Sequence, residues 1–357
     1  MRRLLIITWL LLICAAAASD VVYPPVTDAY RVQLPLDEGA HPQFRTEWWY
    51  VTGWLERETG EPLGFQITFF RTRPGTQEEN PSKFAARQVL FAHAALSDPS
   101  RGRLLLGERA ARAGFGLARA AEGTLDVAID DWSLRKTNAN IYRAVANAEE
   151  FSLDLAFESR QPPLLNGKSG YSQKGTDPLN ASYYYSVPQL AVSGSIVVGK
   201  ERIAVKGSAW LDHEWSTAFL DPQADGWDWI GLNMENGGAL MASRIRRADG
   251  SALWSFATML ESKDSAPRTF SANEIEWIPG RTWRSARTGI TYPVEWRVRV
   301  GDRELRLVPL MDDQESDTRS STGTIYWEGA VRALDVNNRV VGRGYLELTG
   351  YGARLKM

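Results

Sequence analysis

The sequence has very little of the two residue types that most often bind metals or supply a thiol. Its 357 residues include one cysteine, Cys14, and three histidines, His41, His93 and His213. A single cysteine excludes an intramolecular disulfide and a thiolate metal cluster. The histidines are not at the spacing of a helical or strand-borne metal motif, so we expect no metal and no organic cofactor.

Motifs for several common activities are also absent. Acidic and basic residues nearly balance, with 43 Asp and Glu against 41 Lys and Arg, and they are mixed along the chain. This distribution lacks the basic patch of a nucleic-acid-binding protein, so we expect no nucleic-acid partner. Gly114-Phe115-Gly116 lacks the rest of a dinucleotide fingerprint, and Ser193-Gly194-Ser195 lacks the spacing of a nucleophile elbow. Serine hydrolysis therefore has no local support.

A hydrophobic run lies at the N-terminus. Arg2 and Arg3 precede an apolar segment at 4–14, and small residues follow it. Charged, apolar and small residues in this order predict a secretory signal peptide, and the run is short for a membrane span. We expect residues 1–19 to be removed and the mature protein to be periplasmic or secreted.

Two alternatives for export stay open. The pair Arg2-Arg3 is weakly typical of the twin-arginine route, although its usual flanking residues are missing. Cys14 is a candidate for lipidation, although Ile13 precedes it where lipoprotein signals have a small residue. Cleavage of a signal peptide by either export route removes Cys14, whereas lipidation modifies it.

The sequence is rich in aromatic residues, with 14 Trp, 12 Tyr and 12 Phe, many of them in short segments of period-two alternation. Residues 46–55 alternate with aromatics on both faces, a turn follows at 58–60, and the alternation resumes at 65–70, which predicts a β-hairpin. The same pattern recurs in both halves of the chain, and helical periodicity is weak, at 81–88 and 141–150. Many short strands with turn signals predict β-sandwiches or closed barrels.

The length of the chain favours two domains. A Pro-rich, irregular lead-in occupies 20–45. We expect one β-barrel at 46–216 and a second at 217–357, so that the fold is all-β.

Asp212-His213-Glu214, followed by Trp215, is the most informative segment. On a strand, period-two alternation points His213 and Trp215 towards an apolar interior and both carboxylates towards the other face. A buried imidazole beside an indole is either an acid-base group or a satisfied core histidine, and both interpretations stay open.

Further carboxylates lie among aromatic residues: Glu47, Asp228, Glu328 and Glu347. A buried carboxylate costs several kcal/mol unless it is paired or protonated. Each is therefore a structural ion-pair partner or a functional acid. The candidate basic partners are Arg45, Arg71, Arg244 and Arg343.

Taken together, these segments resemble a known family. Residues 47–53, 207–216, 226–229, 326–329 and 344–351 are similar to blocks of the AttH family of exported lipocalin-like proteins. That family is similar to the carotenoid 1,2-hydratases, also called hydroxyneurosporene synthases. The resemblance implies two lipocalin-like β-barrels in tandem.

The resemblance also implies candidate site residues. The hydratases add water to an isoprenoid double bond without a cofactor, and their Asp-His-x-Trp motif matches Asp212, His213 and Trp215. They also use a tyrosine and an aspartate on a following strand, but 238–245 contains neither. Asp228 is our candidate for the missing acid. The other candidate ligand-binding residues are Trp229, Trp49, Tyr184 and Glu47.

We therefore expect an apolar, isoprenoid or lipid-like ligand in a pocket in or between the barrels, with His213 at its polar end. Two functions stay open. The protein is a carrier associated with an ABC-type export system, which the resemblance implies because some members of the family look like partners of such systems, or it is a cofactor-independent hydratase. In the second case His213 or a neighbouring acid protonates the double bond, and Trp215 and Trp229 stabilise the carbocation.

Overall fold

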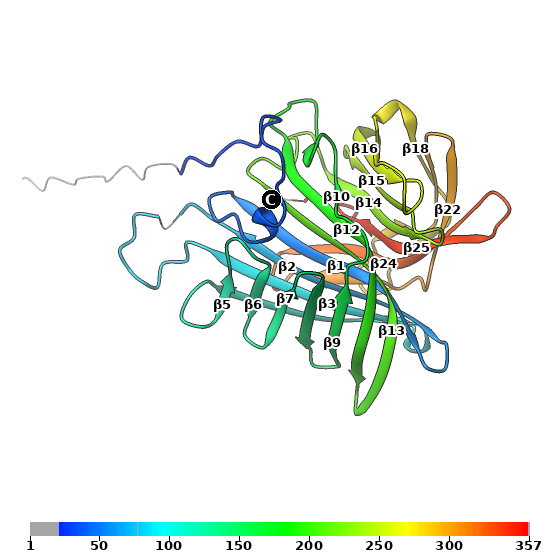
Figure 1. The fold of residues 1–357 in the computed structure, drawn as a ribbon, viewed down its shortest axis with the longest axis horizontal. Helices are drawn as coiled ribbons and strands as arrows, with labels where there is room; N and C mark the ends of the chain where they lie inside the picture. The colour runs from blue at the N-terminus through cyan, green and yellow to red at the C-terminus, as the bar shows by residue number, and fades with distance from the viewer. Residues whose placement is uncertain (1–20, 77, 356–357) are drawn as a thin grey trace, which may run out of the picture.

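The computed structural model describes residues 21–76 and 78–355, so the leader expected at 1–19 lies outside the described residues. The regular secondary structure of the described chain is almost entirely antiparallel β-strand (Figure 1). Its helical segments are single 3-10 turns at Leu36–Glu38, Pro99–Arg101 and Ala272–Glu274. In this part of the chain, no helix is long and apolar enough to span a membrane. The all-β prediction is confirmed.

The first sheet contains 13 strands among the described residues, ordered β4-β3-β2-β1-β13-β12-β9-β8-β7-β6-β5, with β10 and β11 paired to β12. The sheet curls until β4 contacts β6, which nearly closes a barrel. Its strands are β1 (Thr46–Arg57), β2 (Pro62–Thr72), β3 (Val89–Asp98), β4 (Arg103–Arg112), β5 (Ala118–Ala120), β6 (Asp126–Ile129), β7 (Trp132–Asn138), β8 (Ile141–Asn147), β9 (Phe151–Glu158), β10 (Leu164–Leu165), β11 (Tyr171–Gln173), β12 (Ala181–Val198) and β13 (Glu201–Ser216).

The second sheet contains 10 strands among the described residues, ordered β17-β16-β15-β14-β25-β24-β22-β21-β18, with β23 paired to β24. A separate hairpin joins β19 (Thr282–Arg284) and β20 (Thr291–Pro293). The strands of the second sheet are β14 (Gly226–Met234), β15 (Ala239–Arg246), β16 (Ala252–Leu260), β17 (Arg268–Phe270), β18 (Ile275–Pro279), β21 (Trp296–Val300), β22 (Arg303–Pro309), β23 (Glu315–Thr318), β24 (Thr324–Leu334) and β25 (Val340–Leu348).

The expected hairpin at 46–70 is confirmed as β1 and β2, which pair in register from Thr46↔Thr72 to Glu56↔Pro62. Gly60 in the connecting turn has a φ of 90°, which glycine adopts without steric cost. The weak helical expectation at 141–150 is wrong, because β8 occupies most of it. Its buried residues recur at every second position (Tyr142, Ala144, Ala146), which is the period of a strand. Residues 81–88 form turns and irregular structure.

The strands of the two sheets come from separate parts of the chain, 46–216 and 226–348. The segment at 217–225 connects them. That each part folds as an independent domain stays a prediction. The lead-in is irregular, as expected, but Val26, Val32 and Phe44 pack into the core of the first barrel.

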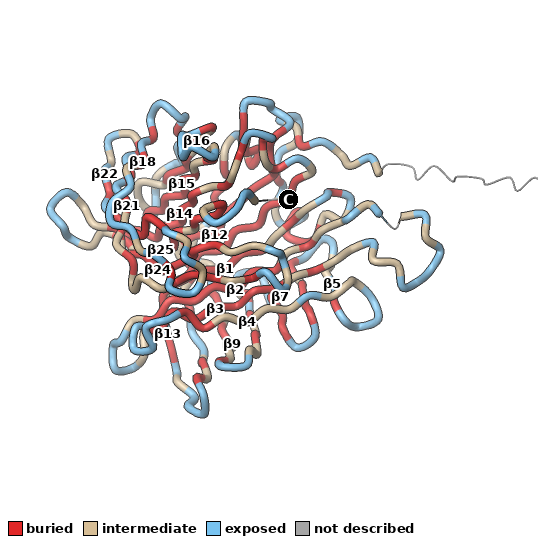
Figure 2. The backbone as a smooth tube through the Cα atoms, turned by 180° about the vertical axis from the view of Figure 1, so that it is seen from behind, coloured by how far each residue is buried: buried red, intermediate tan, exposed pale blue. Residues whose placement is uncertain are grey.

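The two sheets pack against each other through β1, β2, β12 and β13 on one side and β14, β24 and β25 on the other. Figure 2 shows these central strands buried along most of their length. A separate apolar cluster occupies part of this interface, and the Trp54 indole donates to the Gly344 carbonyl across it at 3.0 Å. Most of β1 and the second half of β13, residues 209–216, are therefore covered on both faces. This double burial explains why aromatic residues occur at even and odd positions of β1.

Candidate functional site

Strand β13 separates two buried environments. His213 and Trp215 point into the first barrel, and Asp212 and Glu214 point towards the interface between the sheets. The prediction that they lie on opposite faces is confirmed. The second face is not solvent, however, because the second sheet covers it and leaves Asp212 only 3% and Glu214 only 5% exposed.

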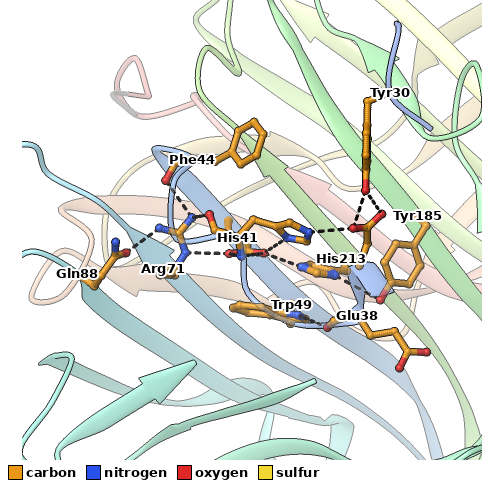
Figure 3. Close-up of polar contacts among 11 residues, drawn as sticks. Tyr30, Glu38, His41, Phe44, Trp49, Arg71, Gln88, Tyr185 and His213 are labelled. Carbon is orange, nitrogen blue, oxygen red and sulfur yellow. Dashed lines mark hydrogen bonds and ion pairs between the residues drawn. The ribbon is translucent and has the colours of Figure 1, made fainter. Parts of the chain in front are cut away.

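His41, Arg71 and His213 lie together in a polar cluster inside the first barrel (Figure 3). Glu47, which is fully buried, is the centre of this cluster. Its carboxylate accepts hydrogen bonds from Arg71 Nε at 2.8 Å, His213 Nε2 at 2.9 Å and His41 Nδ1 at 2.8 Å. Arg71 also donates to the carbonyls of His41 and Phe44 at 3.0 Å each. The cluster therefore fastens the lead-in segment to β1, β2 and β13.

The hydrogen bonds set the protonation of the cluster. Burial opposes ionisation of Glu47, but its bonds to His213 and His41 and the charge of Arg71 hold its pKa well below the usual range. Burial lowers the pKa of His213, whose Nδ1 lies 3.3 Å from the Tyr185 hydroxyl. Burial also opposes a positive charge on His41, but two nearby carboxylates outweigh this effect and raise the pKa of His41.

Aromatic rings pack against the two histidines of the cluster. His41 stacks on Trp215 with ring centroids 3.8 Å apart, and His213 stacks on Trp49 at 4.8 Å. Trp49 and Trp215 belong to the apolar core of the first barrel. These neighbours match the interpretation of His213 as a satisfied core histidine.

Among the described residues, His41, Glu47 and His213 form the group whose potential ligand atoms come together, all within 4.8 Å of one another. These atoms already satisfy each other, and the Arg71 guanidinium is 2.8 Å from Glu47. A cation would have to displace those protons and would meet a like charge. The group therefore fits a metal poorly, and the expected absence of a metal stays a prediction.

A cavity of about 850 Å³ lies between the two sheets. Its walls come from β1, β2, β3, β12 and β13 of the first sheet, from β14, β15, β16, β24 and β25 of the second, and from loops that include 217–222. The predicted residues Asp212, Tyr184 and Trp229 line it, whereas Glu47, Trp49, His213, Trp215 and Asp228 do not. The aromatic residues of the lining are Trp48, Tyr50, Phe70, Phe91, Tyr184, Phe219, Trp227, Trp229, Phe256 and Tyr326.

Asp228 lies in an ion-pair network away from this cavity. Arg244 Nη2 is 2.6 Å and Arg246 Nε is 3.0 Å from its carboxylate, and the Tyr351 hydroxyl donates to it at 2.9 Å. Arg244 was one of the predicted structural partners. In this geometry Asp228 holds β14 to β15 and to the C-terminal segment.

Asp212 is held by three donors at the cavity wall. One carboxylate oxygen accepts from Ser186 Oγ at 2.6 Å and Trp210 Nε1 at 2.7 Å, and the other from the Tyr184 hydroxyl at 2.8 Å. Tyr184 in turn accepts from Trp229 Nε1 at 3.1 Å. Burial outweighs these bonds and raises the pKa of Asp212 to about 7. Asp212 can therefore give and take a proton near neutral pH.

Glu214 pairs with a buried lysine on the same side of the cavity. Lys174 Nζ is 2.8 Å from its carboxylate, and Ser182 Oγ also donates to it. The ammonium lies 4.2 Å from the Phe256 ring centroid and 4.8 Å from that of Tyr184. Burial lowers the pKa of Lys174 and raises that of Glu214. This wall thus holds an ammonium ion between aromatic faces and a carboxylate.

The second sheet contributes two more carboxyl groups. Glu328 on β24 is directly opposite Glu347 on β25, which puts their side chains on the same face as neighbours. Trp227 Nε1 donates to Glu347 at 2.9 Å. Burial and the neighbouring charge of Glu347 raise the pKa of Glu328 well above its usual value, and burial raises the pKa of Glu347 to about 7.

His93 joins the two sheets at another part of the cavity wall. Its Nδ1 lies 2.9 Å from the Tyr326 hydroxyl, and its Nε2 lies 3.0 Å from Ser321 Oγ. Burial lowers the pKa of His93 to about 4, so the ring is neutral at neutral pH. Its hydrogen bonds to the second sheet give it a structural role.

Sequence reasoning missed Lys174, Glu214 and His93 as parts of one site. They come from an irregular loop, β13 and β3, so no short motif contains them. A signal was present in 205–215, where Trp210 lies on the same face as Asp212 and Glu214. A large aromatic ring beside two carboxylates marks a face that another part of the protein covers.

Solved structures of other proteins have the same fold as this chain. A solved structure of an AttH protein from Nitrosomonas europaea is 48% identical, covers 92% of this chain and 99% of its own, and superimposes with a TM-score of 0.86. The structure of kievitone hydratase from Nectria haematococca covers 94% of this chain and 97% of its own with a TM-score of 0.68. At 16% identity, this second likeness shows the fold alone.

The sequence comparisons extend to a hydratase and to a whole family. Kievitone hydratase from Fusarium solani subsp. phaseoli is 29% identical over 247 residues, which are 66% of this chain and 68% of the relative. The family model described as AttH-like matches residues 25–351. The expected lipocalin-like fold and the expected family are both confirmed. The chain belongs to the AttH-like family.

Proposed function

We propose that this protein binds an apolar small molecule between its two sheets and adds water across a carbon–carbon double bond without a cofactor. The observation that carries the proposal is Asp212, a buried acid with a pKa of about 7 in the wall of an aromatic-lined cavity of about 850 Å³. The similarity to kievitone hydratase supports the same reaction class.

The reaction needs one proton donor and one water. Protonated Asp212 gives its proton to one alkene carbon, so that the π bond breaks and a C–H bond forms. The indole rings of Trp48 and Trp229 in the cavity wall stabilise the carbocation. Water then forms the C–O bond, and its surplus proton returns to the Asp212 carboxylate. His213 points to the other side of β13, so in this proposal it supports the strand and donates no proton.

The same cavity supports a second candidate function, the carriage of an apolar ligand in association with an ABC-type export system. The size and aromatic lining of the cavity suit a ligand that is bound and not altered. The absence of the hydratases' tyrosine and aspartate in 238–245 also favours carriage.

The two functions are separated by the fate of the bound molecule. We expect an apolar compound to copurify with protein from its native host, and we expect its mass to increase by one labelled water after incubation in ¹⁸O-water. Kievitone serves as a defined second probe. Mass spectrometry of the extracted ligand is the measurement. A tightly bound ligand with unchanged mass, together with unchanged kievitone, contradicts the hydratase and leaves the carrier.

We further propose that the protein is exported and that cleavage follows the small residues at 15–19. N-terminal sequencing of protein from the native host should then find a mature chain that starts near Ser19 or Asp20. A chain that retains Met1, or one that begins at a lipidated Cys14, contradicts this proposal.

A further inference from the structure

The carboxyl pair Glu328–Glu347 has an unusual combination of burial and missing partners. Glu328 is 3% exposed, and Glu347 is half-buried at the cavity. Among the described residues, neither carboxyl group has a lysine, arginine or histidine within ion-pair distance. The other buried acids differ in their partners, since Glu214 has Lys174, Asp228 has two arginines, and Asp212 has three neutral hydrogen-bond donors.

Polar atoms beside this pair are also unsatisfied. Within the described residues, Glu328 Oε1 and the Tyr50 hydroxyl are both buried and interact only with each other, in a geometry too poor for a regular hydrogen bond. Both residues line the cavity, and they come from different sheets. A buried polar atom without a good partner destabilises the protein, so a ligand group that supplies the partner gains binding free energy.

The missing partner must donate hydrogen bonds and should carry positive charge. The two carboxyl groups oppose each other's ionisation, so a cation bound between them would let both ionise and act as acceptors, and the Tyr50 hydroxyl can accept as well. A ligand hydroxyl has a single hydrogen to donate, whereas a protonated primary amine has three and also offsets the charge of the pair. Trp229, which is directly opposite Glu347 in the pairing of β14 with β25, adds cation–π attraction.

The opposite wall shows that this cavity accommodates such a group. The Lys174 ammonium is held by the Glu214 carboxylate at 2.8 Å and by the rings of Phe256 and Tyr184. The Glu328 end has the same components, a carboxyl pair and aromatic rings, but no protein cation among the described residues.

We propose that Glu328, Glu347 and Tyr50 form a binding site for the protonated amino group of an amphiphilic amine, whose apolar body occupies the aromatic part of the cavity. This inference goes beyond hydration, because it requires binding and no turnover.

The test compares two probes that differ in one group, n-decylamine and 1-decanol, by calorimetric titration at neutral pH. We expect the wild type to bind the amine about 10-fold to 100-fold more tightly than the alcohol. Glu328→Gln keeps the shape of the side chain and removes its charge, so it should abolish this preference and leave the affinity for decanol unchanged. Glu276→Gln, on an exposed strand position paired with Arg299, is the matched control and should keep the preference.

Each other outcome counts against the site. Equal affinity for the two probes, no binding of the amine, or a preference that persists in Glu328→Gln overturns the proposal. Unchanged decanol binding in Glu328→Gln shows that the variant is folded. A wild type without a preference for the amine contradicts the amine site but not the hydratase proposal, which rests on Asp212. A wild type that prefers the amine but adds no water to an alkene contradicts the hydratase proposal only.

Discussion

Replacement of Glu47 with alanine is expected to lower the free energy of unfolding by about 3–5 kcal/mol. The change leaves the Arg71 guanidinium buried, at 2% exposure, without its carboxylate, and it removes the acceptor shared by His41 and His213. An uncompensated buried charge costs more than the salt bridge contributes. Denaturant titration of wild type and variant, followed by fluorescence or circular dichroism, measures the difference.

The control is a salt bridge on the outside of the same barrel. Asp154 pairs with Arg143 at 2.8 Å, but both side chains are about half exposed. Asp154→Ala should therefore change the free energy of unfolding by no more than about 1 kcal/mol. Equal losses for the two variants would show that the Glu47 cluster contributes no more than a surface pair.

The contribution of Glu47 should also depend on pH in a defined direction. Its pKa in the folded protein is held below the usual value of 4.5, so the folded state favours the ionised form. The stabilisation is complete above that usual value and is lost as the pH falls below it. The difference between wild type and Glu47→Ala should consequently be largest near neutral pH and become smaller in acid.

The fold was predictable because alternation is a local property. In β1, β2 and β13 the period of two identifies strands from the sequence alone, and the glycine turn at 58–60 closes the first hairpin. The error at 141–150 arose from a strand whose inner residues include two alanines, Ala144 and Ala146, which carry a weak hydrophobic signal.

The site was predictable only in part, because a strand has two faces and the sequence does not say what covers each. Alternation correctly placed Asp212 and His213 on opposite sides of β13. The ligand was expected on the inner side, beside His213, but the Glu47 cluster fills that side. The cavity lies on the outer side, and it exists because strands more than one hundred residues later, β24 and β25, cover it.

Long-range strand pairing also explains why the sequence identified Glu328 and Glu347 as candidates but did not predict that they form a pair. Glu328 and Glu347 were identified as carboxylates among aromatics, but their position opposite each other depends on the register between β24 and β25. A shift of one residue would turn one of them to the other face. Composition and spacing within a strand do not determine that register.

Replacement of Asp212 with asparagine is expected to lower the turnover of water addition by about 100-fold to 10,000-fold. Asparagine has the same shape but no acidic proton, so ligand affinity should change little while the rate falls. In the wild type the rate should fall as the pH rises through about 7, because Asp212 must be protonated to act. Conversion of the copurified ligand or of kievitone in ¹⁸O-water, measured over a range of pH, tests both statements.

The contrasting variant is His213→Ala, one residue further along the same strand. His213 contacts Glu47, Trp49 and Tyr185 inside the first barrel and does not line the cavity. Its loss should lower the free energy of unfolding by about 1–3 kcal/mol, because a buried partner is left unmatched. The molecules that remain folded should still convert the ligand.

Full turnover in Asp212→Asn, with none in folded His213→Ala, would reverse the assignment and place the proton donor inside the first barrel. Loss of turnover in Asp212→Asn alone would place the reaction in the cavity between the sheets, since that is the side of β13 that Asp212 faces.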